Sequence, residues 1–179
     1  MSYIPLHIHS EYSILSSSIS LDALVSQAKK SDLPALALTD FGNLHGVVDF
    51  YKKTIKAGIK PILGLEIMVA PALMSEKKKA YGQKVGYPVL LLAKDNEGYS
   101  NLCRLTSLGF TEGFYYFPRI DRPTLKKYSK GLIALSGPVE GFLGSHIIAG
   151  DEEATKETLD WFLEVFGSDF YLEMQRHTM

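Results

Sequence analysis

Two histidines near the N-terminus are the residues best suited to carry chemistry. His7 and His9 stand two positions apart in the otherwise apolar segment Pro5–Ser10. In an extended strand, side chains at positions i and i+2 point to the same side, so both imidazoles would face one way. Neutral imidazole binds divalent metals well, so the pair could form half of a metal site. The pair alone is weak evidence, because such a pattern is also common for polar residues on a strand.

Two acidic residues strengthen the case for a site. Asp40 directly follows 34–39, a short and nearly all-apolar run, and Glu66 lies among the apolar residues of 60–70. Both runs are typical of strands buried in a parallel sheet. In such sheets functional residues gather at the C-terminal ends of the strands, where the two histidines also fall. We therefore expect these four side chains to lie near one another.

The elements that would position these residues alternate along the chain. Strands are predicted at 3–9, 34–39, 60–70, 87–93, 131–136 and 170–175. Helices are predicted at 20–30, 46–57, 95–108, 123–128 and 152–166, and 139–149 is a short helix or irregular. This alternation favours an α/β fold whose parallel strands are joined by right-handed crossovers. Neither an internal repeat nor a linker divides the sequence, so residues 1–179 are predicted to form one domain.

Helix ends and faces follow from particular residues. Ser20 is a suitable N-cap, because its hydroxyl can accept from an unpaired N–H of the first turn. In the helix at 46–57 we expect Val47, Phe50, Tyr51 and Ile55 to point inward.

Composition is ordinary for a soluble globular protein. The chain has 179 residues, of which 46% are apolar and 22% charged, with a net charge of −1. This charge provides no overall attraction for nucleic acid, so any binding of DNA by the chain should be modest. Cys103 is the single cysteine, which excludes an intrachain disulfide and suits a reducing compartment. Neither a signal peptide nor a membrane-spanning run is evident, so a cytoplasmic protein is expected.

Two surface segments allow two interpretations each. The run 76–79, with one glutamate and three lysines, could contact an anionic partner or form a solvated loop, and a loop is the commoner outcome. The segment 109–122 is rich in aromatic residues and contains Arg119. Such residues can stack on nucleic-acid bases, but they more often pack within a loop.

Several segments resemble one known family. Leu6–Ser13, Pro34–Asp40 with Gly42 and Asn43, and Ala57–Ile62 with Gly64 and Glu66 are similar to the PHP (polymerase and histidinol phosphatase) domain at the N-terminus of bacterial DNA polymerase III alpha subunits. The similarity continues through Glu97–Leu102, Gly131–Gly137 and Tyr171–Gln175, and thus covers essentially the whole chain. The resemblance implies a distorted (β/α)₇-type barrel. It also implies a trinuclear metal cluster in intact members, some of which act as 3′–5′ proofreading exonucleases.

The resemblance further implies that this cluster is depleted here. His7 and His9 match the first two ligands, and Glu66 matches a bridging carboxylate. Four further ligands of the family are replaced. Ser16 stands in place of an aspartate, Phe41 and Pro88 each stand in place of a histidine, and Pro138 stands in place of a cysteine or histidine. A final Asp-x-His pair would lie beyond Met179. We therefore expect an incomplete barrel, with an open edge covered by a helix or another chain.

The replaced ligands decide between two functions. The first is a degenerate PHP domain without catalytic residues, which serves as a structural and docking module of a DNA polymerase III alpha subunit in DNA replication. The second is a metal-dependent phosphoesterase with an atypical site. No cofactor is expected beyond, at most, one Zn²⁺ or Mn²⁺ at a vestigial site of His7, His9 and Glu66. Alternatively, these three are satisfied by hydrogen bonds to one another and to water, with Phe41 packed against them.

The same resemblance suggests the partners. These are the other parts of the polymerase alpha subunit, a separate proofreading exonuclease subunit, and DNA through the parent polymerase. No membrane is expected among them.

Overall fold

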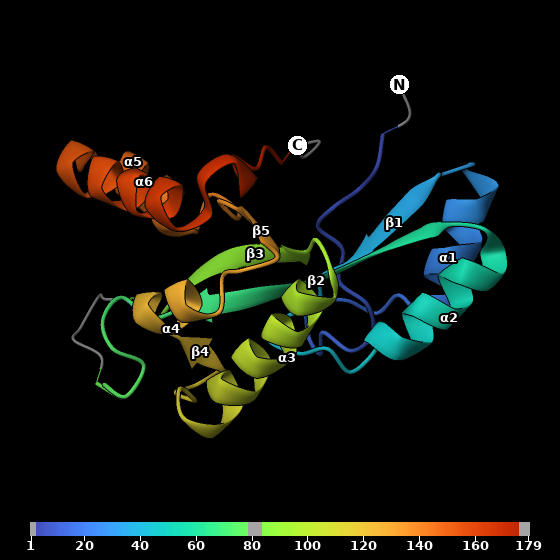
Figure 1. The fold of residues 1–179 in the computed structure, drawn as a ribbon, viewed down its shortest axis with the longest axis horizontal. Helices are drawn as coiled ribbons and strands as arrows, with labels where there is room; N and C mark the ends of the chain where they lie inside the picture. Colours follow the sequence, from blue (N-terminus) through green and yellow to red (C-terminus); the bar gives the residue numbers. More distant parts are fainter. Residues whose placement is uncertain (1–2, 79–83, 176–179) are drawn as a thin grey trace.

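A mixed sheet forms the centre of the computed structural model, which describes residues 3–78 and 84–175 (Figure 1). Its strands are β1 (Ala35–Leu38), β2 (Lys60–Val69), β3 (Tyr87–Ala93), β4 (Arg119–Ile120), β5 (Leu132–Leu135) and β6 (Phe170–Tyr171). Their order is β1-β2-β3-β5-β6, and β4 pairs with the end of β2. Within the described residues the sheet is open, as the sequence predicted, and the α/β class is confirmed.

The prediction that all strands run parallel is wrong. The pairs β1–β2, β2–β4 and β5–β6 are parallel, whereas β3 runs antiparallel to both β2 and β5. The described part of the connection from β2 to β3 contains no helix. A parallel pair needs a long crossover, usually helical, whereas an antiparallel pair does not. The missing helix between these two strands was therefore the signal for the reversal.

The predicted strand at 3–9 is also wrong, because this segment is not assigned as a strand. Pro5 has no N–H to offer to a sheet ladder. Only Ile8 makes strand-like bonds: Thr39 N donates to Ile8 O over 2.8 Å, and Ile8 N donates to the Thr39 hydroxyl, also over 2.8 Å. At the other end of the chain, the predicted strand 170–175 shortens to β6.

The helices begin close to where the sequence placed them. They are α1 (Leu21–Lys30), α2 (Val47–Ala57), α3 (Asn96–Thr111), α4 (Arg122–Lys127), α5 (Phe142–Ala149) and α6 (Glu152–Phe166), followed by the 3₁₀ turn η1 (Gly167–Asp169). Ser20 caps α1 as predicted, since its Oγ accepts from Ala23 N over 3.2 Å. Aspartates cap α3, α4 and α6 in the same way.

The inward face of α2 differs from the prediction. Val47 and Phe50 are buried, but Tyr51 and Ile55 are about half exposed, at 49% and 54%. Thr54 is buried in their place, and its hydroxyl donates to the Phe50 carbonyl over 2.8 Å. A threonine whose hydroxyl is satisfied within its own helix can occupy a core position, so the buried stripe follows positions i, i+3 and i+7.

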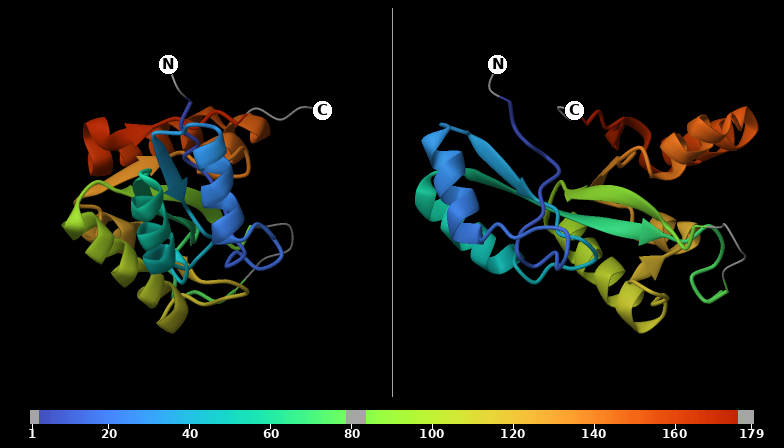
Figure 2. Two further views of the ribbon diagram at one scale, coloured as in Figure 1. Left: turned by 90° about the vertical axis from the view of Figure 1, so that its right-hand side faces the viewer. Right: turned by 180° about the vertical axis from the view of Figure 1, so that it is seen from behind.

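Two hydrophobic clusters lie on the helix-covered face of the sheet. One joins α1 and α2 to β1, and the other joins β2, β3 and β5 to α3, α4, α5 and α6. Figure 2 shows α1 and α2 together at one end of the molecule and the α5–α6 pair at the other. The third cluster, Leu90, Leu92 and Leu135 with Leu6, Ile62 and Ile133 around them, lies apart from the other two.

The aromatic segment 109–122 packs as a loop around a buried arginine. The guanidinium of Arg119 donates to the carbonyls of Gly113, Val85, Met74 and Glu76, and the residue is only 2% exposed. It is therefore a structural clamp and is not available to stack on bases.

Two further surface expectations can be compared with the structure. Residues 76–78 of the lysine-rich run are exposed loop, and Lys79 lies outside the described residues. None of the helices that the structure describes is long and apolar enough to cross a bilayer.

Candidate metal-binding site

Three of the predicted site residues converge. His7 and His9 come from the N-terminal segment, and Glu66 comes from β2. His9 Nε2 lies 2.6 Å from Glu66 Oε2, and His7 Nε2 lies 3.6 Å from the same oxygen. One ligand-type atom from each residue falls within 4.8 Å of the other two. Imidazole nitrogens with a carboxylate oxygen form a donor set that suits Zn²⁺.

Thr39, directly after β1, fixes the orientation of the two histidines through Ile8, the residue between them. It binds Ile8 through its backbone N–H and accepts from Ile8 N through its hydroxyl. Fixing Ile8 in this way places its neighbours His7 and His9 together on the other side of the segment. Their rings meet edge to face with centroids 5.3 Å apart. The shared orientation that the spacing predicted is therefore present without a regular strand.

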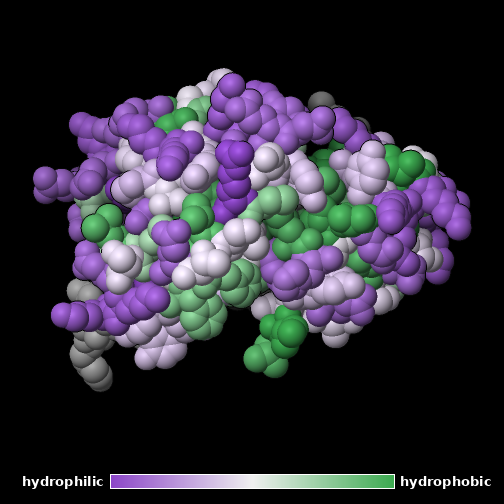
Figure 3. Space-filling model, turned by 60° about the horizontal axis from the view of Figure 1, so that its bottom comes forward, coloured by the Kyte–Doolittle hydropathy of each residue, from purple (hydrophilic) through white to green (hydrophobic). Residues whose placement is uncertain are grey.

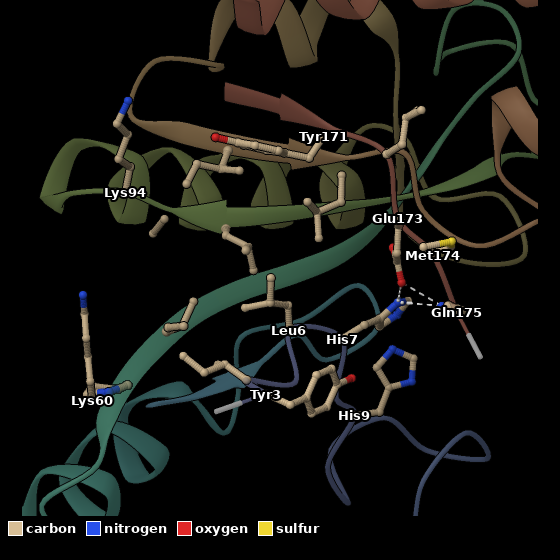
Figure 4. A pocket seen from close by; sticks show the side chains of 18 of the residues that line it. Tyr3, Leu6, His7, His9, Lys60, Lys94, Tyr171, Glu173, Met174 and Gln175 are labelled. Carbon is tan, nitrogen blue, oxygen red and sulfur yellow. Dashed lines mark hydrogen bonds and ion pairs between the residues drawn. The ribbon is translucent and has the colours of Figure 1, made fainter. Parts of the chain in front are cut away.

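A fourth ionisable residue, Glu173, completes the cluster and was missed in the sequence. His7 Nδ1 lies 2.7 Å from Glu173 Oε1, and the Gln175 amide donates to the same oxygen over 2.8 Å (Figure 4). Glu173 follows β6 by two residues, so its place after a strand was the one available signal. Its partner is 166 residues away, and local sequence patterns do not report such a contact.

Burial and charge perturb all three titrating partners. Burial, the largest effect on His7, lowers its pKa, but the adjacent Glu173 and Glu66 carboxylates outweigh it and raise the pKa from 6.5 to about 9. Burial raises the pKa of Glu66, and the interactions with His7 and His9 outweigh it and lower the pKa to about 2. The pKa of Glu173 is lowered as well, mainly by His7 against the opposing effect of burial. Without metal, His7 is therefore a cation between two carboxylates.

Asp40 does not join this cluster. Its buried carboxylate accepts from Ser10 N over 2.6 Å, from Ser10 Oγ over 2.7 Å and from Ser13 Oγ over 2.6 Å. Ser13 Oγ in turn accepts from Phe41 N over 2.9 Å. Asp40 therefore fastens the loop that follows His9 to the end of β1, and its role is structural.

The fastened loop carries an exposed apolar tip. Ile14 and Leu15 are 82% and 102% exposed, and Leu15 has a φ of +69°. This left-handed conformation is unfavourable for a residue with a Cβ.

In the space-filling view of the underside, hydrophobic and hydrophilic side chains are interspersed (Figure 3).

The four replaced positions line one hollow beside the cluster. This hollow of about 470 Å³ is bordered by His9, Glu66 and the replacements Ser16, Phe41, Pro88 and Pro138, with Met68, Lys84, Gly86 and Glu140 completing it. Phe41 pairs with Glu66 through a β-bridge, and its ring packs edge to face on Phe117. Proline and phenylalanine side chains have no donor atom for a metal. Of the residues that line the hollow, His9, Glu66 and Glu140 carry an imidazole or a carboxylate.

A larger groove of about 1130 Å³ opens on the other side of His7 (Figure 4). Its floor includes Leu6, Ile62, Leu92, Ile133 and Leu135, with Lys60 and Lys94 among the residues farther from the cluster. The Lys94 ammonium is paired with Asp169. The groove thus joins an apolar stretch to polar side chains, with the histidine cluster at one end.

One buried atom tests whether the cluster fits a metal. His9 Nε2 is shielded from solvent and has no aligned hydrogen bond, despite its short distance to Glu66. Buried polar atoms are almost always satisfied, so an unpaired imidazole nitrogen pointing at a carboxylate needs an explanation. A cation bound to both groups would supply one, and the donor set of these residues therefore fits a metal ion.

A family model and several known proteins are similar in sequence to this chain. The family model described as "PHP domain" matches residues 5–177. A DNA polymerase III subunit alpha from Chlamydia muridarum is 50% identical over 177 residues, which cover 99% of this chain and 14% of that protein. Its counterpart from Borreliella burgdorferi is 47% identical over 175 residues, covering 98% of this chain and 15% of that protein. The chain thus spans about one seventh of the length of these relatives.

Among solved structures, an amidohydrolase from Chromobacterium violaceum aligns with a TM-score of 0.45 and 16% identity, covering 89% of this chain and 44% of that one. At this TM-score the likeness supports no inference. The family model, by contrast, spans residues 5–177, which is nearly the whole chain. The chain therefore belongs to the PHP domain family.

Proposed function

We propose that this chain is the PHP domain of a DNA polymerase III alpha subunit and acts in DNA replication as a structural and docking module rather than as a nuclease. The identity to alpha subunits supports the parent protein. In this proposal residues 1–179 form one domain. Its partners are other parts of the alpha subunit and a proofreading exonuclease subunit. DNA is reached through the parent polymerase, in the cytoplasm.

The composition of the 470 Å³ hollow is the observation that carries the proposal. Among the described residues, His9 and Glu66 of this hollow form, with His7 beside them, the group whose ligand atoms lie within 4.8 Å of one another, and the Glu140 carboxylate borders the hollow outside that group. Phosphodiester hydrolysis by metal clusters requires ions held close together, to activate water and to stabilise the leaving oxygen. Phenylalanine and two prolines occupy further positions of the hollow, and the described residues offer no second cluster of ligands there for another ion.

A single Zn²⁺ or Mn²⁺ at His7, His9 and Glu66 is part of the proposal. When bound, such an ion supplies a positive charge that ties the N-terminal segment to β2. His7 must lose its proton to bind the ion, and because the pKa of His7 is raised to about 9, metal affinity should increase with pH.

Metal content and nuclease activity test the proposal together. We expect elemental analysis of the purified chain, loaded with Zn²⁺ or Mn²⁺ and then desalted, to give no more than one ion per chain. We also expect nucleotide release from single-stranded DNA to equal that of a His7→Ala/His9→Ala variant. Two or three ions per chain, with metal-dependent release that this variant lacks, would establish the alternative, a metal-dependent phosphoesterase.

Docking is tested in the parent protein. We expect an alpha subunit that lacks residues 1–179 to lose binding to the exonuclease subunit while the His7→Ala/His9→Ala variant retains it. Unchanged binding after the deletion would refute a docking role.

A further inference from the structure

The two ring nitrogens of His7 face two carboxylates that lie far apart in the sequence, Glu173 and Glu66. Nδ1 lies 2.7 Å from Glu173 Oε1, within hydrogen-bond distance. Nε2 lies 3.6 Å from Glu66 Oε2, which is too long for a hydrogen bond. The two contacts are therefore different in kind. Glu173 binds the ring, whereas Glu66 stands opposite a nitrogen to which it makes no hydrogen bond.

This asymmetry fixes the chemistry of the neutral ring. When Nδ1 carries the proton and donates it to Glu173, the lone pair of Nε2 points toward Glu66 and His9. Metal-binding histidines almost always donate their second ring N–H to such a partner, which sets both the tautomer and the ring orientation. We propose that Glu173 is a positioning residue that holds His7 ready to bind a single divalent ion at His7, His9 and Glu66.

The surroundings of Glu173 suit this role. Its backbone N–H donates to the Ser136 hydroxyl over 2.9 Å, and Ser136 N donates to the Tyr171 carbonyl over 3.0 Å. These bonds anchor the segment after β6 to the end of β5. Gln175 donates to the same carboxylate oxygen that faces His7, over 2.8 Å. The carboxylate is thus held from both its backbone and its side chain, and its side chain is only 9% exposed.

The proposal rests on the single-ion part of the proposed function and assigns Glu173 a role that differs from that of a ligand. Glu173 contacts the nitrogen of His7 that faces away from Glu66. A Glu173 that merely formed an ion pair with protonated His7 would stabilise the fold without favouring metal. The two roles therefore predict opposite effects on metal affinity, because an ion pair competes with the metal for His7.

Zinc affinity of the full chain, measured by competition with a chromophoric chelator, separates these roles. We expect Glu173→Ala to weaken Zn²⁺ binding about 10- to 100-fold. Glu173→Gln should restore part of the loss, because its amide oxygen can still accept from Nδ1–H. Glu164→Ala is the matched control: this carboxylate is paired with Lys126 at the surface, and its removal should leave the affinity unchanged.

A double-variant cycle shows whether Glu173 acts through His7. In a His7→Ala background, Glu173→Ala should have no further effect on Zn²⁺ affinity. An equal loss in both backgrounds would mean that Glu173 acts on the ion by charge alone, and would overturn the proposal.

The histidine tautomer provides an independent readout. In ¹⁵N-histidine spectra of the zinc-loaded chain, we expect the His7 Nε2 signal to shift on zinc binding while a slowly exchanging Nδ1–H persists. Glu173→Ala should remove that slow proton. If the His7→Ala background binds zinc too weakly for comparison, this spectrum shows whether Glu173 acts through His7.

Besides an equal loss in both backgrounds, three results would reject the positioning role. These are unchanged or tighter zinc binding in Glu173→Ala, metal on His7 Nδ1, and a wild-type chain that binds no zinc. Only the last would also remove the single ion from the proposed function, and none of the three bears on docking.

Discussion

Replacing Asp40 should unfold the start of the chain, because this carboxylate is the acceptor for three buried or partly buried donors. The Asp40 carboxylate makes no hydrogen bond to the side chains of Glu66 or the two histidines, so the effect is one of stability. In Asp40→Ala, Ser10 N, Ser10 Oγ and Ser13 Oγ all lose their acceptor. An unsatisfied buried donor costs about 1–3 kcal/mol, and the two hydroxyls can rotate toward other acceptors, so we expect a total loss of about 3–5 kcal/mol.

Urea unfolding followed by circular dichroism measures this loss. With a slope of about 2 kcal/mol per molar urea, a loss of 4 kcal/mol lowers the midpoint by about 2 M. Asp40→Asn keeps one acceptor oxygen and should show roughly half the shift. The matched control is Asp22→Ala, which removes an aspartate that is paired with Lys53 at the surface and should change the midpoint little. If Asp40→Ala unfolds at the same urea concentration as Asp22→Ala, the carboxylate does not hold this loop.

Three substitutions and a pH series test the packing at Gly113, the backbone conformation of Leu15 and the charges of His7 and Glu66. Gly113→Ala should destabilise the fold by about 3 kcal/mol, since the added Cβ would lie 1.8 Å from the Arg119 carbonyl; a normal melting temperature would contradict the packing described. Leu15→Gly should raise the free energy of unfolding by about 1 kcal/mol by relieving the positive φ, and a destabilised variant would show that the leucine is favourable there. In metal-free buffer the His7 contribution to stability should be complete below pH 6.5 and lost as the pH rises through 9, because its folded pKa is raised. The contribution of Glu66 to stability should be complete above pH 4.5 and lost as the pH falls toward 2, because its folded pKa is lowered. In a plot of urea midpoint against pH, His7→Asn should flatten the alkaline part, where His7 loses its proton.

The sequence predicted most helices well because their ends depend on local residues. Ser20 caps α1 and Gly58 ends α2 in the left-handed conformation, and both effects act over a few residues. The face of α2 was only partly predicted, because hydropathy alone does not show that Thr54 can satisfy its own hydroxyl. Strand direction failed at β3, where strand spacing was given more weight than the missing helix before it.

The candidate site was predicted in part. The spacing of His7 and His9 and the position of Glu66 within a buried run were sufficient to predict that those three come together. Asp40 had the same kind of position but is used by nearby serines, and position alone does not separate a ligand from a structural acceptor. Glu173 depends on how the end of the chain returns to its beginning, which is a property of the tertiary fold.

The contact between His7 and Glu173 also bears on the order of folding. Closing a flexible loop of 166 residues costs about 4.5 kcal/mol of chain entropy by the logarithmic rule, before any contact compensates for it. The intervening strands and helices must therefore form first and shorten the effective loop. Contacts of such long sequence separation form slowly. The cluster at His7 should be among the last parts of this chain to assemble, so protection of its slow imidazole proton would report completed folding better than helix content does.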